Sequence, residues 1–266
     1  MMSEVKAYPH GTFSWVDLAT TDGAAAKAFY TGLFGWDSFD MPLPGGGAYT
    51  MLLQAGKNVA ALSEMSPEMV ASGMPTVWNS YITVTDVDAT TAQVAALGGT
   101  VLAGPFDVMD AGRMSTIQDP TGAVVSLWQT TGHRGADLFN LPNSLGWNEL
   151  ATRDAEAAKA FYTALIGWQP ATDENNYTVW LNNGRANGGM IIMDENWPDV
   201  PPHWMVYFAV ADAAATVAQA EALGGKIHMG PTPAGDIGTF ALIEDPTGAT
   251  FTAIQLNEPD TDLPGE

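Results

Sequence analysis

One long stretch of this chain occurs twice with small changes. The segment FSWVDLATTDGAAAKAFYTGLFGW begins at Phe13, and LGWNELATRDAEAAKAFYTALIGW begins at Leu145. Within this stretch AKAFYT returns after 132 residues, and the separate motif DPTGA, at Asp119 and Asp245, returns after 126. Motifs that recur in the same order at nearly constant spacing predict two homologous halves that share one fold.

The repeat also sets the expected domain boundaries. We expect a first domain over residues 8–131 and a second over 143–257, joined by a polar linker with Gly and Pro over 132–142. Residues 258–266 are expected to form an acidic tail. Because 46% of the 266 residues are hydrophobic, the chain can bury a core in each half.

Each half divides once more into two similar modules. Asp22, Asp86, Asp154 and Asp212 each follow a β-prone run and precede an Ala-rich stretch with apolar residues at helical spacing. Aspartate in this place is typical of a helix N-cap. Short β-prone segments follow each predicted helix, so the unit is β-α-β-β-β. Four such units predict an α+β fold.

Charge and cysteine content narrow the range of partners. The chain has 30 acidic and 9 basic residues, a formal net charge of −21, which repels phosphate backbones and anionic lipids. We therefore expect neither nucleic acid nor a membrane as a partner. The absence of cysteine excludes disulfides and thiolate-bound zinc. The chain has no apolar run near the roughly 18 residues of a membrane span and no secretion-signal pattern, so a cytoplasmic protein is expected. The sequence leaves both a monomer and a homodimer open.

The order of the modules and motifs resembles the vicinal oxygen chelate superfamily. Paired βαβββ units that end in strand–DPTGA–strand are typical of this group, which includes glyoxalase I, extradiol dioxygenases and bleomycin resistance proteins. The resemblance covers about residues 10–257 and is to the tandem two-domain type familiar in actinobacteria. It implies four βαβββ modules paired into two glyoxalase-like half-open barrels, each with a cavity lined by inward-facing strand residues.

The resemblance also implies where a metal would be bound. Enzymes of this superfamily use His, Gln or Glu placed seven residues before a strand-end Asp or seven after the Asp of the DPxG turn. The matching positions here hold Trp15, Asn79, Ser126, Trp147, Met205 and Thr252. Indole has no free lone pair and the others are poor ligands, so we expect neither a metal nor another cofactor. A relocated metal site formed by His203 and Glu149 is the alternative, and His10, His133 and His228 are expected at the surface.

Strand alternation predicts which residues face the two cavities. Residues two apart on a strand share a face, so the inward set follows from the positions above. It comprises Phe13, Trp15, Asp17, Asn79, Tyr81, Ser126 and Trp128 in the first half, and Trp147, Glu149, Met205, Tyr207, Thr252 and Ile254 in the second. Large aromatic residues with few polar groups suit a planar apolar ligand, and the carboxylates would favour a cationic or amine-bearing one. Ordinary core packing is the alternative for each residue.

Three functions are compatible with this pattern. The first is metal-independent binding of a hydrophobic aromatic small molecule, either to sequester an antibiotic or natural product or to assist a tailoring oxygenase. The second is a lyase or isomerase that acts on a reactive carbonyl or quinone-like substrate, with a relocated metal or with Glu149 or Asp17 as the acid–base group. The third is a scaffold that serves only association. We expect a binding protein more than a metal-dependent enzyme.

Overall fold

The first half of the chain folds into eight strands and three helices in the computed structural model, which describes residues 4–44, 46–258 and 263–264. The strands are β1 (Thr12–Thr20), β2 (Asp37–Pro42), β3 (Ala48–Gln54), β4 (Lys57–Glu64), β5 (Val77–Thr83), β6 (Thr100–Val108), β7 (Gly112–Gln118) and β8 (Val124–Thr130). The helices are α1 (Gly23–Phe34), α2 (Pro67–Ala71) and α3 (Val87–Val94), the last followed by the 3-10 turn η1 (Ala95–Leu97).

The second half repeats this order with one helix fewer among its described residues. Its strands are β9 (Ser144–Thr152), β10 (Gln169–Thr172), β11 (Thr178–Asn182), β12 (Arg185–Ile192), β13 (His203–Ala209), β14 (Lys226–Ala234), β15 (Gly238–Glu244) and β16 (Thr250–Leu256). Its helices are α4 (Ala155–Ile166) and α5 (Ala213–Ala222). The predicted α+β fold of four βαβββ modules is confirmed.

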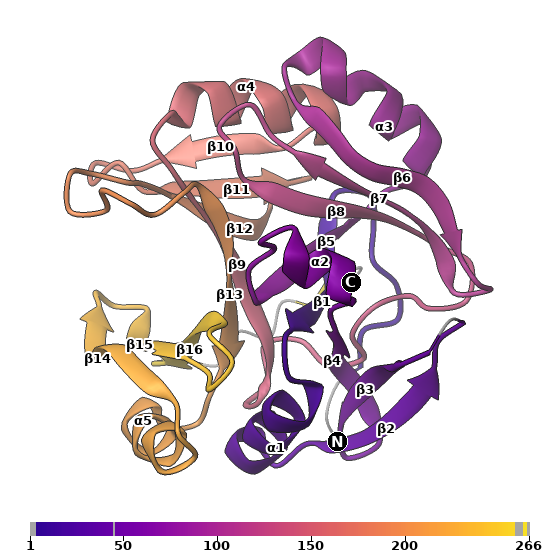
Figure 1. Ribbon diagram of the computed structural model, residues 1–266. Helices are drawn as coiled ribbons and strands as arrows, with labels where there is room; N and C mark the ends of the chain where they lie inside the picture. The colour runs from indigo at the N-terminus through magenta and orange to yellow at the C-terminus, as the bar shows by residue number, and fades with distance from the viewer. Residues whose placement is uncertain (1–3, 45, 259–262, 265–266) are drawn as a thin grey trace.

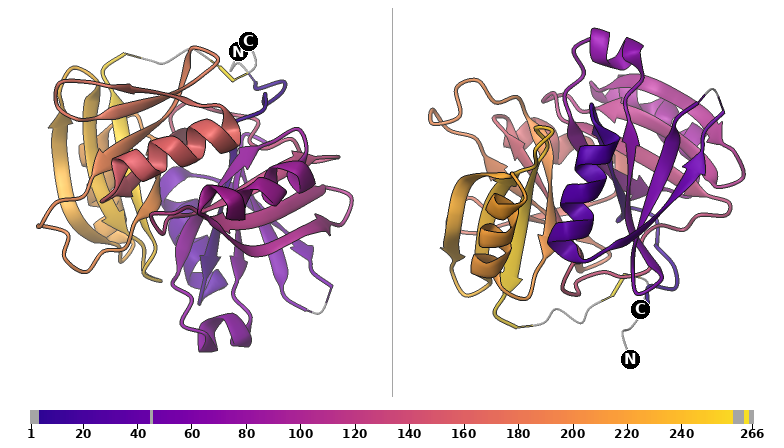
Figure 2. Two further views of the ribbon diagram at one scale, coloured as in Figure 1. Left: turned by 90° about the horizontal axis from the view of Figure 1, so that it is seen from above. Right: turned by 60° about the horizontal axis from the view of Figure 1, so that its bottom comes forward.

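Each half forms one curved eight-stranded sheet. The strand orders are β2-β3-β4-β1-β5-β8-β7-β6 and β10-β11-β12-β9-β13-β16-β15-β14, so the two modules of a half meet at the antiparallel pairs β1–β5 and β9–β13. The two concave faces open in opposite directions, with α1 and α5 at one end of the molecule and α3 and α4 at the other (Figures 1 and 2). The paired sheets confirm the predicted half-open barrels.

The predicted N-caps account for where the four long helices begin. The side chains of Asp22, Asp86, Asp154 and Asp212 each accept a hydrogen bond from the backbone N–H three residues later. This bond satisfies a donor that the first helical turn leaves unpaired. Helices α1 and α4 end at glycines with positive φ, as the Gly-Trp pairs of the sequence suggest.

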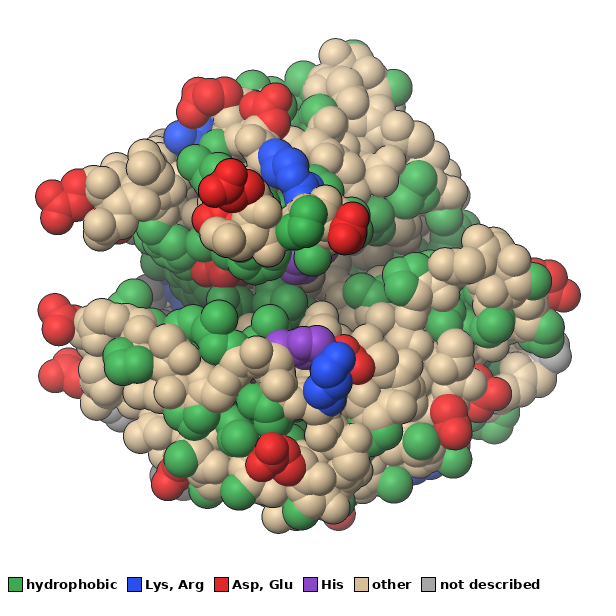
Figure 3. Space-filling model, turned by 60° about the vertical axis from the view of Figure 1, so that its left-hand side comes forward, with side chains coloured by type: hydrophobic (Ala, Val, Ile, Leu, Met, Phe, Trp, Pro, Cys, Tyr) green, Lys and Arg blue, Asp and Glu red, His purple; other side chains and the backbone are tan. Residues whose placement is uncertain are grey.

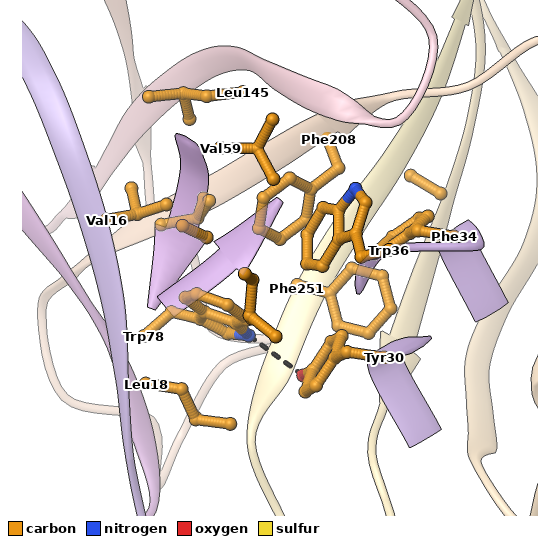
Figure 4. Close-up of a cluster of buried hydrophobic side chains, with 14 of the residues drawn as sticks. Val16, Leu18, Tyr30, Phe34, Trp36, Val59, Trp78, Leu145, Phe208 and Phe251 are labelled. Carbon is orange, nitrogen blue, oxygen red and sulfur yellow. Dashed lines mark hydrogen bonds between the residues drawn. The ribbon is translucent and has the colours of Figure 1, made fainter. Parts of the chain in front are cut away.

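The two hydrophobic cores are each built from both halves of the chain. One core packs α1 and the convex side of β1 and β4 against β13, α5, β15 and β16. In this core the Phe34 and Phe208 rings lie 5.3 Å apart, and the Tyr30 and Phe251 rings lie 5.6 Å apart (Figure 4). The other core packs α3, β7 and β8 against α4 and β12. Module one therefore shares a core with module four, and module two with module three.

The two repeated motifs meet across these cores. The Tyr30 hydroxyl of the first AKAFYT donates to Asp245 Oδ2 of the second DPTGA at 2.9 Å, and Tyr162 donates to Asp119 Oδ2 at the same distance. The other oxygen of Asp119 accepts backbone N–H bonds within its own turn. Burial and the neighbouring carboxylate raise the pKa of Tyr30 and of Tyr162, which keeps both phenols protonated as donors. An indole N–H, from Trp78 or Trp204, donates to each phenol oxygen.

One predicted cavity residue lies on the opposite face of its sheet. Phe13 is only 1% exposed and packs in the core, 4.9 Å from the Trp204 ring and 5.4 Å from that of Trp168. The cause is a β-bulge, because the ladder passes from Phe13 opposite Ile82 to Trp15 opposite Tyr81 and leaves one extra residue in β1. An extra residue reverses the alternation of side chains, so the prediction that Phe13 faces inward is wrong.

The segment between the halves is packed rather than solvent-exposed. Ala136, Leu138 and Phe139 are buried, and the Ala136 N–H donates to the Ser14 carbonyl. Of the predicted acidic tail, residues 259–262 and 265–266 lie outside the described residues, whereas Leu263 packs in the first core. Within the described part of the chain, no helix has the length and apolar character needed to cross a bilayer.

Removing either phenol hydroxyl between the halves is expected to lower stability. Tyr30→Phe or Tyr162→Phe leaves a buried carboxylate oxygen and a buried indole N–H without their partner, at a cost of about 1–3 kcal/mol in the free energy of unfolding. Chemical denaturation measures this loss. Tyr8→Phe, which removes one bond to the Ala136 carbonyl, is the comparison and should cost less. An equal or smaller loss at Tyr30 and Tyr162 would contradict the importance of these contacts.

Candidate functional site

Each concave face contains a cavity. The first has a volume of about 510 Å³ and the second about 820 Å³. Both walls are mainly aromatic and aliphatic, and neither includes a Lys or Arg among the described residues. Figure 3 shows the deep hollow on the face of the second half, with hydrophobic side chains gathered along both of its sides.

Most predicted cavity residues do lie in a cavity wall. In the first half the wall includes Trp15, Asp17, Tyr81 and Trp128. In the second half it includes every predicted residue, namely Trp147, Glu149, Met205, Tyr207, Thr252 and Ile254.

Two predicted residues of the first half lie beside the wall instead of in it. The Asn79 amide donates to Asp17 Oδ1 at 3.0 Å. The Ser126 hydroxyl lies 3.2 Å from the Thr116 hydroxyl. Asn79 and Ser126 are therefore each one hydrogen bond away from the cavity, Asn79 through Asp17 and Ser126 through Tyr81.

A buried carboxylate with two phenols forms the bottom of the second cavity. Tyr207 donates to Glu149 Oε1 at 2.6 Å and Tyr177 donates to Glu149 Oε2 at 2.9 Å. The indole N–H of Trp147 donates to the Tyr177 oxygen at 3.2 Å. We name Trp147, Glu149, Tyr177 and Tyr207 the Glu149 cluster. The cross-strand pairs Glu149–Met205 and Trp147–Tyr207 of β9 and β13 bring three of its members together.

The first cavity has the same arrangement. Tyr49 and Tyr81 donate to Asp17 Oδ2 at 3.0 and 2.8 Å, and the Trp15 indole donates to the Tyr49 oxygen at 2.9 Å. We name Trp15, Asp17, Tyr49 and Tyr81 the Asp17 cluster. The sequence prediction omitted Tyr49 and Tyr177 from the cavities. Their correspondence between the two halves is the signal that would have identified them.

Burial controls the ionisation of both clusters. It raises the pKa of Asp17 and of Glu149 above the usual carboxyl range, and the hydrogen bonds from the phenols oppose this rise. Burial also raises the pKa of Tyr177 and Tyr207, and the adjacent Glu149 charge adds to that effect. The phenols therefore remain protonated and stabilise the carboxylate by donating to it.

The two clusters differ in how far they are open to their cavities. Trp15 is 3% exposed and Tyr81 is 8% exposed, whereas their counterparts Trp147 and Tyr207 are half-buried. Tyr49 and Tyr177 are half-buried alike. In the first half a large indole, Trp128, occupies the position at which the second half has Ile254. The second cavity is the larger one, whereas the two carboxylate residues are equally buried, with Asp17 7% and Glu149 8% exposed.

His133 also closes the first cavity, which corrects the prediction that it lies at the surface. Its ring is in the cavity wall, edge-on to Trp15 with 4.4 Å between ring centres. Burial lowers the pKa of His133 and favours the neutral imidazole. The sequence placed His133 in a polar linker, and nothing in its neighbours indicated that this segment folds back over the sheet.

The residues at the expected metal positions do not fit a divalent cation. The N–H groups of Trp15 and Trp147 point to phenol oxygens as donors, and an indole offers no lone pair in return. Among the described residues, no three His, Asp or Glu side chains converge on one point. Glu149 and His203 both line the second cavity, but each Glu149 oxygen accepts a phenol and His203 Nδ1 lies 2.9 Å from the Pro201 carbonyl.

Three further titratable side chains have structural partners outside the cavities. Arg113 forms ion pairs with Asp88 and Asp107. His228 Nε2 lies 2.6 Å from a Glu244 oxygen, and His10 Nδ1 accepts the Thr85 N–H. None of these groups is in the wall of either cavity.

Comparison with known proteins agrees with this architecture. The family described as "Glyoxalase/Bleomycin resistance protein/Dioxygenase superfamily" matches residues 12–127 and 144–252. The chain is 47% identical over 259 residues to "Putative glyoxylase CFP32" of Mycobacterium bovis, covering 96% of this chain and 98% of that protein. It is 38% identical over 263 residues to "Anthracycline biosynthesis protein DauV" of Streptomyces sp. strain C5, covering 93% and 94%.

Solved structures show the same fold at low sequence identity. The 2,3-dioxygenase LapB of Pseudomonas sp. KL28 aligns with a TM-score of 0.65 at 13% identity, over 96% of each chain. The Mn(II)-bound glyoxalase of Novosphingobium aromaticivorans aligns with a TM-score of 0.65 at 18% identity, over 97% of this chain and 86% of that one. The two family matches together span most of the chain, which therefore belongs to the glyoxalase/bleomycin resistance protein/dioxygenase superfamily.

Proposed function

We propose that the second cavity binds a planar, hydrophobic aromatic small molecule without the help of a metal. The observation that carries this proposal is an open cavity of about 820 Å³ whose polar groups at the bottom already hydrogen-bond one another. A ligand in such a cavity gains most of its binding free energy by covering the aromatic and aliphatic wall. Its volume is in the range of known small-molecule sites.

The charge of the cavity favours a ligand that is neutral or cationic. Asp173, Asp236 and Glu258 lie in its wall together with Glu149, and the chain as a whole carries a net charge of −21. An anionic ligand would meet repulsion on approach, whereas an amine would be attracted. Tyr and Trp faces add to this preference through cation–π contacts.

The name of one group of relatives supports an aromatic natural product as the ligand class. DauV and the DnrV protein of Streptomyces peucetius are both named as anthracycline biosynthesis proteins. Anthracyclines are planar polycyclic aromatics, which is the shape that the cavity wall suits. We propose that this chain sequesters such a compound or presents it to an oxygenase that modifies it.

Filling the second cavity is expected to weaken binding of a planar probe such as 9-phenanthrol. Ile254→Trp introduces the indole that the first half carries at Trp128. Gly238 leaves room for it, because its counterpart Gly112 lies so close to Trp128 that a Cβ would be 2.3 Å from the ring. Titration calorimetry should show at least a tenfold loss of affinity.

A surface tryptophan provides the control for this substitution. Val124→Trp adds the same side chain at an exposed position outside both cavities and should bind 9-phenanthrol as the unmodified protein does. Equal affinity in the Ile254→Trp and Val124→Trp proteins would place the ligand outside the second cavity.

Ligand charge is expected to change affinity in a salt-dependent way. The cationic 9-aminoacridine should bind more tightly than anthracene-9-carboxylate, a planar anion of similar size, because only carboxylates charge this wall. The difference in affinity between the two compounds should decrease as the salt concentration rises toward about 1 M, where the screening length is about 3 Å. Tighter binding of the anion would contradict the proposed ligand class.

A catalytic role for Glu149 is the second candidate function. Its carboxylate is buried with a raised pKa and lies beside two phenols in an accessible cavity, which is a typical environment for a general base. A lyase or isomerase acting on a carbonyl compound would use it to remove a proton next to the carbonyl. Exchange of such protons for deuterium, followed by NMR and absent in Glu149→Gln, would support this role.

The raised pKa of Glu149 makes a further prediction about stability. A folded-state pKa above the unfolded value means that the contribution of Glu149 to stability is largest at low pH and falls as pH rises through the folded pKa. The stability of the unmodified protein relative to Glu149→Gln should therefore decrease as the pH rises above the ordinary carboxyl range. Thermal denaturation of both proteins over a series of pH values measures it, with exposed Glu221→Gln on α5 as the control.

A further inference from the structure

Every hydrogen that the Glu149 cluster can donate is directed within the cluster. An indole and a phenol each have a single polar hydrogen, and an ionised carboxylate has none. The hydrogen of Trp147 goes to Tyr177, and those of Tyr177 and Tyr207 go to the two oxygens of Glu149. The Thr252 hydroxyl, also in the cavity wall, hydrogen-bonds Tyr207.

The Glu149 cluster can still accept hydrogen bonds from a ligand. Carboxylate oxygens have more lone pairs than the two phenols use, and all four members of the cluster lie in the wall of the second cavity. The neighbouring Met205 contributes only a thioether, which is a weak acceptor. A ligand at the bottom of this cavity therefore meets acceptors and no available donor from these side chains.

The Asp17 cluster has the same direction of bonding, although the residues around it have changed. Trp15 donates to Tyr49, and Tyr49 and Tyr81 both donate to Asp17. The side chain next to the carboxylate on the adjacent strand is Asn79 in one half and Met205 in the other. The two clusters have different neighbouring residues but the same direction of hydrogen bonding. This indicates that the direction itself matters for which ligands the cavity binds.

We propose that the ligand of the second cavity presents a hydrogen-bond donor, an aromatic hydroxyl or an N–H, to the Glu149 cluster. This inference rests on the proposed function and adds the chemical group by which ligands are chosen. A ligand with only acceptors at this point loses its bonds to water and gains none in return. The cluster thereby selects hydroxylated or amino-substituted aromatics over their ethers, esters and carboxylates.

A matched pair of ligands tests the proposal. Titration of the full-length protein with 9-phenanthrol and with its methyl ether, 9-methoxyphenanthrene, compares the same ring system with and without a donor. We expect the methyl ether to bind at least tenfold more weakly. Equal affinities would overturn this inference and leave the proposed function intact, whereas failure of both compounds to bind would overturn the proposed function as well.

Glu149→Gln should remove the preference for the donor. The amide group of Gln donates hydrogens, so one phenol must accept and its own hydrogen becomes available to the ligand. The ratio of the two affinities should then fall to about twofold or less, whereas Glu221→Gln on the exposed face of α5 keeps the ratio of the unmodified protein. If Asp17→Asn lost the preference for 9-phenanthrol and Glu149→Gln kept it, the assignment to the second cavity would be overturned.

A spectroscopic readout on the unmodified protein keeps the test independent of any variant. Donation of the 9-phenanthrol hydroxyl to a carboxylate shifts its absorption to longer wavelength, as partial ionisation of a phenol does. We expect this shift on binding. A bound spectrum that matches 9-phenanthrol in an aprotic apolar solvent would overturn the proposal even if Glu149→Gln did not fold.

Discussion

The contact on which the arrangement depends is the buried hydrogen bond from a helix tyrosine of one half to a turn aspartate of the other. Tyr30 reaches Asp245, and Tyr162 reaches Asp119, inside cores that both halves share. Each aspartate also holds its own turn together through backbone N–H bonds. Because the convex sides of both sheets are packed in the shared cores, a ligand can reach only the concave sides. The cavities are thus a consequence of how the halves pack.

Inside the cavities, the dominant constraint is the cost of burying a carboxylate in an apolar wall. Asp17 and Glu149 are stabilised by two phenols each, and an indole orients one phenol in each set. At the positions where the family resemblance implies a metal ligand, this chain has tryptophans that donate hydrogen bonds to phenols. The indoles at Trp15 and Trp147 orient these phenols in addition to forming part of the cavity walls.

The sequence was sufficient for the features that depend on local periodicity and repeats, and insufficient for those that depend on contacts between distant segments. The four N-cap aspartates follow from spacing within one strand and helix, and the inward-facing Trp15 and Glu149 follow from strand alternation together with the metal positions that the family resemblance implies. Phe13 could not be placed, because a bulge one residue away reverses its side and leaves no local mark in the sequence. His133 was missed for a related reason, since only the folded chain shows that the linker covers Trp15.

The sharing of each core by both halves has a consequence for how such a chain can change over time. A substitution in the helix tyrosine or the turn aspartate of one half removes a hydrogen bond to the other half and so disturbs the packing of both. The concave walls face solvent on opposite sides and have no such mutual dependence (Figure 1). Duplication has therefore given the chain shared cores that constrain both halves and two cavity walls that can change separately. One cavity can come to bind a new ligand while large side chains fill the other.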